Sequence, residues 1–502
     1  MNSLMKSIVL LAFGLYESTD KLAREALEEA LLLDSRQPYF TGFEPNGFEL
    51  PAIQGVPRAQ QIRLGRTILS DQRFWALSRL SFAANRETRQ TIAFIGNSSV
   101  PTYSNSLLER SQGLDLPQDE SLWTQIEMGA RPTDWLFVRG SIHGGASLTH
   151  FRDQGSEGSP GWYHPENLYA EARWNSFVLS LGRKSLFWGQ ADSGALLVSD
   201  NATNFDRVEI SSLAQRWPWI FSYLGDLKAS LFLSRLNDNR VHPNDWFSGF
   251  RLGIKPTPIF ELNLAFMYQF GGHGIAGHSA REVLVEVLGG RTETGAGVHD
   301  VTNATNRSAE LDMRFSFSDW KIPTSIYWEN YLEDCCGSIE DILTKSYGYS
   351  FGVLQRSSAA PDALKWRVEY VRLPNSTYWN GGRPSGWTNE NALIGNPVGR
   401  DSQRVIATLG QYRNQIRSEI SGSVFWQERL RTGMLVRESI KSAFTNFASE
   451  KSWGLNLGTK TQVLSKTFFD SVVQYQRVQE RDNLKGHSTN EWGMLARFEF
   501  QF

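Results

Sequence analysis

The sequence has almost no cysteine. Its 502 residues contain only two, Cys335 and Cys336, and these two are adjacent. Oxidation of neighbouring cysteines would close a strained ring, so a structural disulfide is not expected. A metal site would need further ligands close by, and Glu333 and Asp334 are the only candidates. We therefore interpret the pair as incidental thiols of a loop and expect no metal site.

An excess of one charge sign is also missing. Lysine and arginine total 51, aspartate and glutamate total 53, and the formal net charge is −2. A nucleic-acid-binding protein of this length would carry a marked positive excess. The charge balance therefore predicts no nucleic-acid partner.

Long apolar runs are absent as well. The apolar segment Ser7–Tyr16 is too short to cross a bilayer. Together with the short polar segment Met1–Lys6 it resembles an export signal, and we predict a signal peptide over residues 1–19. Since no segment could form a transmembrane helix, a membrane location would require a closed β-barrel, because lipid offers no partner for unpaired strand edges.

Signs of catalysis are sparse. The zinc-protease pattern H-E-x-x-H does not occur. His273 and His278 lie five residues apart in a glycine-rich loop and resemble a metal pair only loosely. No arrangement of a nucleophile with a base stands out. We predict a protein without enzymatic activity, metal or cofactor.

Aromatic residues, by contrast, are abundant. They make up 12% of the chain, with 17 tryptophans, and glycine is frequent at 43 residues. This composition is typical of many half-exposed strands with aromatic side chains at a membrane interface. A soluble all-β protein such as a propeller would fit the composition equally well.

Period-two alternation recurs along most of the chain and indicates strands. It is regular over Leu311–Phe317, Glu261–Phe266 and Leu227–Leu231. The polar face holds charged side chains, as a hydrated barrel interior would. The last six residues, Arg497–Phe502, alternate aromatic with polar side chains and end in Phe502, which resembles the terminal strand of outer-membrane barrels. These patterns favour a transmembrane antiparallel β-barrel.

Connection lengths support this interpretation, since such barrels have short periplasmic turns and long outer loops. Short and long connections are expected to alternate along the chain. The expected short ones are Arg131–Asp134, Asn175–Ser176, Lys255–Pro258, Asp319–Pro323, Gln411–Gln415 and Leu464–Thr467. The expected long ones are 144–167, 185–204, 237–247, 271–307, 333–345, 374–402, 429–450 and 480–490. Alternation requires Leu435–Ile440 to belong to an outer loop rather than a strand, and it predicts about 18 to 20 strands.

The segment before the barrel contains one expected helix, Asp20–Asp34, with an apolar stripe at helical spacing. It could cover the periplasmic mouth or act as a spacer. We therefore divide the chain into a signal peptide (1–19), a periplasmic helix with an extended segment (20–58) and an outer-membrane barrel with long outer loops (59–502).

The middle of the chain resembles a known family. The carrying residues are Ser180–Gln190 (SLGRKSLFWGQ), followed by Gly194–Leu197 and Asn201-Ala202, with a second block at Ile394–Asp401 (IGNPVGRD). They resemble the signature and a late glycine-rich loop of the capsule-assembly Wzi family of outer-membrane proteins, and the resemblance spans roughly residues 60–502.

The resemblance implies a monomeric barrel of 18 strands, closed by periplasmic helices and outer loops. It implies a lectin-like role in retaining capsular polysaccharide at the cell surface, with the N-terminus in the periplasm. This sequence departs from the family in having one convincing N-terminal helix rather than a small bundle. A porin-like channel for small polar solutes therefore remains the alternative function, and outer-membrane lipid and capsular or exopolysaccharide are the expected partners.

Sugar binding needs aromatic faces for stacking on a pyranose ring and polar groups for its hydroxyls. The candidate polysaccharide-binding residues are Trp162, Tyr163, Trp246, Tyr378, Trp379, Arg383, Trp387 and Asn389. The alternative is that these aromatic side chains belong to the membrane girdle or pack loops together. For the signature residues we favour a structural role in a loop that folds inward and closes the pore; they are Gly182, Arg183, Trp188, Gly189 and Gln190. Arg183 is expected to pair with a lumenal carboxylate such as Glu171.

Overall fold

The computed structural model describes the chain in separate stretches, and the structural statements below concern these residues. They are residues 76–87, 90–94, 101–104, 119–147, 161–217, 223–238, 240–275, 279, 281, 305–318, 320–333, 348–358, 360, 362–374, 376–378, 383, 385–390, 392–429, 448–464, 467–481 and 485–501. The expected helix at Asp20–Asp34, the expected signal peptide and the cysteine pair lie outside them, so the domain boundaries stay predictions.

Most of the described chain is antiparallel strand. The strands are β1 (Ala76–Glu87), β2 (Gln90–Phe94), β3 (Pro101–Ser104), β4 (Asp119–Thr133), β5 (Leu136–Ser147), β6 (Gly161–Trp174), β7 (Phe177–Arg183), β8 (Asp206–Ser212), β9 (Gln215–Arg216), β10 (Asp226–Arg235), β11 (Trp246–Thr257), β12 (Phe260–Phe270), β13 (Asn306–Phe317), β14 (Thr324–Glu333), β15 (Gly348–Arg356), β16 (Lys365–Leu373), β17 (Thr388–Asn389), β18 (Ala392–Leu393), β19 (Ser402–Arg413), β20 (Ser418–Arg429), β21 (Glu450–Leu464), β22 (Thr467–Gln479) and β23 (Thr489–Gln501). One short 3-10 helix, η3 (Asn414–Ile416), joins β19 to β20.

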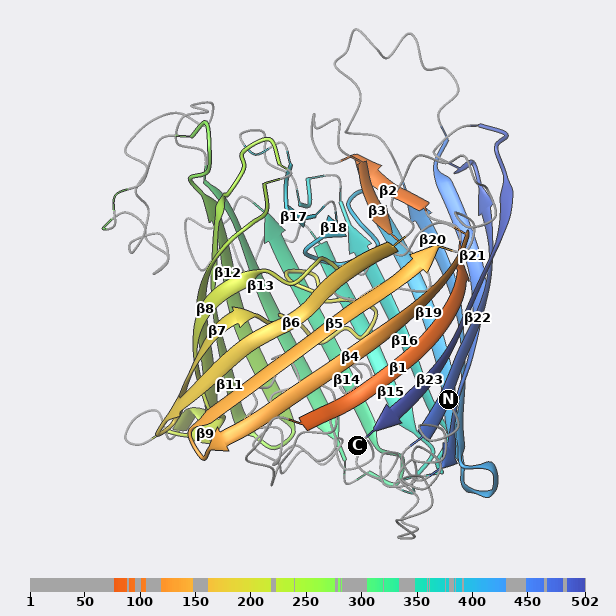
Figure 1. The fold of residues 1–502 in the computed structure, drawn as a ribbon, viewed down its shortest axis with the longest axis horizontal. Helices are drawn as coiled ribbons and strands as arrows, with labels where there is room; N and C mark the ends of the chain where they lie inside the picture. The colour runs from red at the N-terminus through yellow and green to blue at the C-terminus, as the bar shows by residue number, and fades with distance from the viewer. Residues whose placement is uncertain are drawn as a thin grey trace, which may run out of the picture.

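The largest sheet contains 19 strands and closes into a barrel (Figure 1). Its first strand, β1, pairs with β23 on one side and with β4 on the other, so the ladder returns to its start. Strands β8 and β9 pair with different parts of β10 and share one position, which leaves 18 positions in the ring. The predicted all-β barrel of about 18 strands is confirmed. Closure removes the sheet edges that would otherwise expose unpaired backbone groups.

The two rims of the barrel differ in the length of their connections. Short connections lie at one rim, named here the turn rim, and long ones at the other, the loop rim (Figure 1). The predicted short connections all lie at the turn rim, where β23 also ends, and the predicted long ones all lie at the loop rim. The turn rim has two further connections that the sequence did not predict, 217–225 and 357–364. Leu435–Ile440 falls between β20 and β21, within a long connection, and lies outside the described residues.

Side chains alternate between the inside and the outside of the wall. Along β7 and β8 exposed and buried residues follow one another, because successive side chains of a strand point to opposite faces. The exposed face carries apolar residues such as Leu168, Leu181 and Val208, while the buried face carries Ser180 and Glu209. This arrangement is apolar outside and polar inside, which suits a barrel surrounded by lipid. Among the residues that the structure describes, no helix is long and apolar enough to cross a bilayer.

The main hydrophobic cluster lies inside the barrel. It joins wall residues such as Phe232, Phe247 and Met267 to residues of two loops that enter the lumen, among them Trp188 and Trp387. These contacts are possible because part of the inner wall is apolar where the loops meet it. The barrel interior is therefore packed in this half rather than lined only by polar groups.

Candidate functional site

The connection between β7 and β8 folds into the barrel. Residues 184–205, named here the plug loop, leave the wall after Arg183 and return to it at Asp206. Nearly all of its side chains are buried, and Ala191, Ala195 and Leu196 have no exposed surface. A loop projecting into solvent would expose such side chains. The plug loop therefore occupies the interior.

A wall carboxylate holds the centre of the plug loop. Glu329 of β14 accepts hydrogen bonds from the backbone N–H groups of Ala191 (2.7 Å) and Leu196 (3.2 Å). The backbone N–H group of Gln190 donates to the same carboxylate. Three donors that would otherwise be buried without a partner are satisfied by one side chain.

A second carboxylate holds the tip of the plug loop. Glu369 of β16 accepts hydrogen bonds from the backbone N–H groups of Asp192 (2.7 Å) and Ser193 (3.0 Å). Arg367, on the same strand, forms an ion pair with the Asp192 carboxylate. Following the strand pairings, β16 lies eight positions from β7 in the ring of 18. The plug loop therefore crosses from one wall almost to the opposite wall.

An arginine sits among the lumenal carboxylates behind the plug loop. Arg251 of β11 has no exposed surface and pairs with Glu310 (3.4 Å) and with Asp312 of β13. Glu310 also accepts a hydrogen bond from the backbone N–H group of Leu197 (2.7 Å). Asp312 accepts one from the Gln190 amide (2.8 Å). Wall charge and plug loop thus form one connected network, in which each buried carboxylate has partners.

Three of the five family-signature residues, Trp188, Gly189 and Gln190, lie in this loop, and the other two, Gly182 and Arg183, end β7. Trp188 is 1% exposed, packs against Phe232 with ring centroids 5.4 Å apart, and forms an isolated β-bridge with Val198. Gln190 reaches Glu261 (3.1 Å) as well as Asp312. These contacts anchor the loop and leave its polar groups facing protein rather than solvent.

The expected pairing of Arg183 with Glu171 is wrong. Arg183 instead forms an ion pair with Asp206 (3.3 Å) on the neighbouring strand. Glu171 is bound by Lys184 (2.7 Å) and Ser180 (3.0 Å). The reason is strand periodicity, because Ser180 and Lys184 share the inward face of this segment and Arg183 lies on the outward one.

Lys184 and its partners illustrate how charge is stabilised inside the barrel. Burial opposes the charged ammonium, but the carboxylates of Glu171 and Glu209 outweigh it and hold the pKa of Lys184 above its ordinary value. The lysine is therefore charged at neutral pH and fixes the first residue of the plug loop to β6.

A second loop, the cover loop, lies on the plug loop. It comprises the described residues of 374–401, between β16 and β19. The Tyr378 hydroxyl donates to the carbonyl of Leu196 (2.5 Å) and accepts from the backbone N–H group of Asn396 (2.9 Å). Asn389 donates to the carbonyl of Thr203 (2.8 Å). The two loops thus pack against each other inside the lumen.

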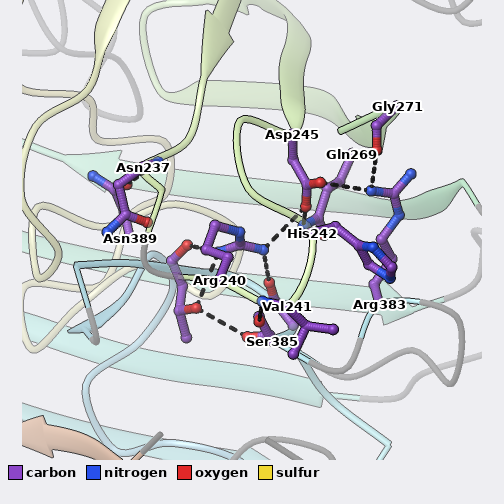
Figure 2. Close-up of polar contacts among 12 residues, drawn as sticks. Asn237, Arg240, Val241, His242, Asp245, Gln269, Gly271, Arg383, Ser385 and Asn389 are labelled. Atoms are coloured by element: carbon purple, nitrogen blue, oxygen red, sulfur yellow. Dashed lines mark hydrogen bonds and ion pairs between the residues drawn. The ribbon is translucent and has the colours of Figure 1, made fainter. Parts of the chain in front are cut away.

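A cluster of charged side chains ties the cover loop to two neighbouring loops (Figure 2). Asp245, before β11, accepts an ion-paired hydrogen bond from Arg383 of the cover loop (2.8 Å) and lies 3.4 Å from Arg240. Arg383 also donates to the carbonyl of Gly271 (2.6 Å). Arg240 donates to the carbonyl of Gly386 (2.8 Å). We name Arg240, Asp245 and Arg383 the latch.

The latch is buried and brings two positively charged guanidinium groups close together. Its three side chains are each about 1% exposed. Burial, together with the neighbouring guanidinium of Arg383, lowers the pKa of Arg240 to about 10, although the Asp245 carboxylate opposes this. Two guanidinium groups share one carboxylate, so removal of Asp245 would leave buried charges facing each other.

The candidate polysaccharide-binding residues fall into three groups. Four are buried in the cover loop, and their polar groups bond within the protein; they are Tyr378, Arg383, Trp387 and Asn389. Tyr163, 78% exposed, and Trp246, beneath the Arg235 guanidinium at 4.1 Å, lie on the outside of the wall near the loop rim. The side chain of Trp162, whose backbone belongs to β6, and Trp379 lie outside the described residues. Sugar binding by these eight residues stays a prediction.

The wall residues that receive the plug loop were not among the candidate residues. Glu310, Glu329 and Glu369 look like ordinary lumen-facing residues in the sequence, since each occupies an inward position of an alternating strand. Their inward position could be predicted from that alternation. Their contact with residues more than 100 positions away could not.

One catalytic pattern does occur in the sequence. Gly348-Tyr349-Ser350-Phe351-Gly352 matches the serine-hydrolase pattern G-x-S-x-G. It lies within β15 rather than at a strand-to-helix turn, and Ser350 has no exposed surface. The match therefore lacks the exposed serine at a strand-to-helix turn that this pattern requires for catalysis. Within the described ranges, no group of three or more His, Cys, Asp or Glu residues could hold a metal ion; His278 lies outside them.

A substitution at Gly189 tests how tightly the plug loop packs against the wall. Its φ is +149°, and a Cβ atom there would lie 2.3 Å from the Ala195 Cβ and 2.6 Å from a Glu329 carboxylate oxygen. We expect Gly189→Ala to displace the plug loop and raise its cleavage by added protease at least several-fold. Gly140→Ala is the control, because its Cβ would meet only a Leu168 methyl at 3.7 Å. Equal protease resistance of the two variants would contradict a tightly seated loop.

Comparisons with known proteins give one family match and several similar solved structures. The family model "Capsule assembly protein Wzi" matches residues 164–479. The Wzi structure from Escherichia coli, described as a carbohydrate-binding β-barrel involved in group 1 capsule assembly, has a TM-score of 0.67 at 17% identity and covers 96% of this chain and 98% of its own. OccAB4 of Acinetobacter baumannii has a TM-score of 0.47 at 8% identity, and the match covers 87% of this chain and 100% of OccAB4. OpdQ of Pseudomonas aeruginosa has a TM-score of 0.46 at 10% identity, and the match covers 85% of this chain and 96% of OpdQ. No curated protein matches the sequence significantly.

Proposed function

Since the chain belongs to the capsule assembly protein Wzi family, we propose that it binds capsular or related exopolysaccharide at the cell surface, in a lectin-like manner and without catalysis. The barrel is monomeric and lies in the outer membrane, with its loop rim outward and its N-terminus in the periplasm. Long connections on the outer side are typical of such barrels.

The observation that carries this proposal, beyond the family, is the plug loop crossing the lumen to Glu369. A channel needs a continuous aqueous path, whereas two loops bonded to the wall and to each other occupy part of this interior. The latch holds the surface of the loop rim in one shape, and a polymer can bind to that surface. Preformed surfaces bind with a smaller loss of conformational entropy.

The proposal is tested by polysaccharide binding. Purified protein in detergent is expected to bind immobilised capsular polysaccharide from the source bacterium saturably. Arg383→Ala is expected to lower the affinity about tenfold or more, since it removes the guanidinium that ties the cover loop to Asp245 and to the carbonyl of Gly271. Arg183→Ala, which removes a partly exposed pair outside the lumen, is the matched control. Absence of binding by the unmodified protein would refute the proposal.

A deletion strain extends the test to the cell. Loss of the protein is expected to release polysaccharide into the medium while its synthesis continues. Normal amounts of cell-associated polysaccharide, with none released, would count against anchoring. The alternative function, a porin-like channel for small polar solutes, is favoured by the charged inner wall. Steady conductance of the unmodified protein in planar bilayers would support that alternative.

A further inference from the structure

The outer surface of four adjacent strands near the loop rim carries a continuous row of aromatic side chains. Trp426 of β20, Trp453 of β21, Tyr475 of β22 and Trp492 of β23 form this aromatic ladder, on the wall segment drawn in blue (Figure 1). Their sequence neighbours point inward and are largely buried, whereas Trp426, Trp453 and Trp492 are 37%, 46% and 63% exposed.

The rings of the ladder contact one another across the strands. Trp426 and Trp453 are direct cross-strand partners. Trp453 and Tyr475 have ring centroids 5.8 Å apart at 69°, and Tyr475 and Trp492 have centroids 4.6 Å apart at 48°. Tyr475 donates its hydroxyl hydrogen to the Asn490 amide oxygen (3.0 Å). Such mutual contacts restrict the rings and present them as one surface.

Polar and cationic groups lie on the loop-rim side of the ladder. Arg477, the cross-strand partner of both Trp453 and Asn490, is exposed and forms no ion pair with any residue that the structure describes. Lys451 is 49% exposed and lies 3.7 Å from Glu428. On the same outward face this row therefore carries a net positive charge.

The other side of the ladder is apolar. The outward residues there, toward the turn rim, are Val424, Leu455, Leu457, Val473 and Met494, all between 40% and 54% exposed. From the loop rim downward the surface thus changes from cation and amide, through aromatic rings, to aliphatic side chains. An amphiphile with a negative group, a sugar and acyl chains has the same order along its length.

We propose that the aromatic ladder, with Arg477 and Lys451, binds a phosphorylated, acylated aminosugar glycolipid of the outer leaflet. The guanidinium and ammonium groups pair with phosphate, the rings stack on the apolar face of the sugar, and the aliphatic residues receive the acyl chains. An ordinary phospholipid has no sugar ring for the aromatic surface. The inference rests on the proposed orientation, in which the loop rim faces outward.

The experiment measures bound lipid directly. Protein purified in detergent is incubated with a diphosphorylated, acylated glucosamine disaccharide or with phosphatidylglycerol, and native mass spectrometry gives the affinity of each. We expect the glycolipid to bind at least about tenfold more tightly, and Trp453→Ala combined with Arg477→Ala to remove that preference. A dephosphorylated glycolipid is expected to bind about tenfold more weakly, because it lacks the partner of Arg477.

Tyr370→Ala is the matched control, since Tyr370 is an outward aromatic residue near the same rim but on β16, where it contacts Tyr349 with ring centroids 5.8 Å apart. It is expected to keep the glycolipid preference. Equal binding of glycolipid and phosphatidylglycerol, or an unchanged preference in the Trp453/Arg477 variant, would overturn the proposal and leave an ordinary aromatic girdle. Polysaccharide binding by the same variant separates the two proposals, because the ladder lies outside the lumen and is expected to leave that binding intact.

Discussion

Replacing both Glu329 and Glu369 by alanine is expected to convert a barrel that passes no steady ion current into one that does. Glu329 accepts hydrogen bonds from three backbone N–H groups of the plug loop and Glu369 accepts two. Each buried donor left without an acceptor costs about 1–3 kcal/mol. Without acceptors for these five donors the centre and the tip of the loop lose their hydrogen bonds to the wall, so we expect the loop to move toward water.

Planar-bilayer recording measures this outcome. The unmodified protein is expected to show no steady current, and the double variant a steady current with a conductance above that of the unmodified protein at every voltage tested. Asp470→Ala is the control, because this carboxylate pairs with Arg497 on the inner wall and not with the plug loop. If the correctly folded double variant passed no ion current, the wall carboxylates would not be the groups that hold the lumen closed.

The second large effect concerns stability. Arg251→Leu removes a fully buried cation from between Glu310 and Asp312. Breaking a buried ion pair by deleting one partner typically costs about 3–5 kcal/mol, because the other charge is left uncompensated. We expect the variant to unfold at markedly lower denaturant concentration, as measured by the loss of the heat-modifiable folded form in gel electrophoresis.

Two further variants identify the cause of that loss. Arg183→Leu removes a pair whose side chains are 23% and 70% exposed, and it is expected to change stability by no more than about 1 kcal/mol. Adding Glu310→Gln and Asp312→Asn to Arg251→Leu is expected to recover part of the loss, because the uncompensated charges disappear. If Arg251→Leu alone were as stable as the unmodified protein, the arginine would have no compensating role.

The barrel itself could be predicted from the sequence because each strand carries its own signal. Leu311–Phe317 and Glu261–Phe266 alternate over their whole length, and both lie within strands of the wall, β13 and β12. The alternation of short and long connections depends only on chain order, which is why the parity argument also placed Leu435–Ile440 in a loop. Where alternation was obscured, as at 217–225 and 357–364, the connection was not predicted.

The candidate site could be predicted less well. Trp387 and Asn389 occur in a stretch rich in aromatic and amide groups, and such a composition suits either sugar binding or internal packing. In the folded chain Trp387 donates its ring N–H to Glu333 (2.9 Å) and is 2% exposed. The sequence shows that Trp387 and Glu333 are present but does not show that they are close together, because Glu333 lies 54 residues earlier and on a different element.

By itself, the sequence determined the class of fold, the inward face of several wall strands and the alternation of short and long connections. These follow from period-two alternation and connection length, which are local properties of a chain. The sequence also predicted a loop at the signature residues that folds inward, whereas only the tertiary structure decided that Glu329 and Glu369 receive this loop. The position of the loop depends on whether its buried backbone N–H groups find acceptors on a distant part of the wall. Only closure of the barrel brings these N–H groups close to the carboxylates of Glu329 and Glu369.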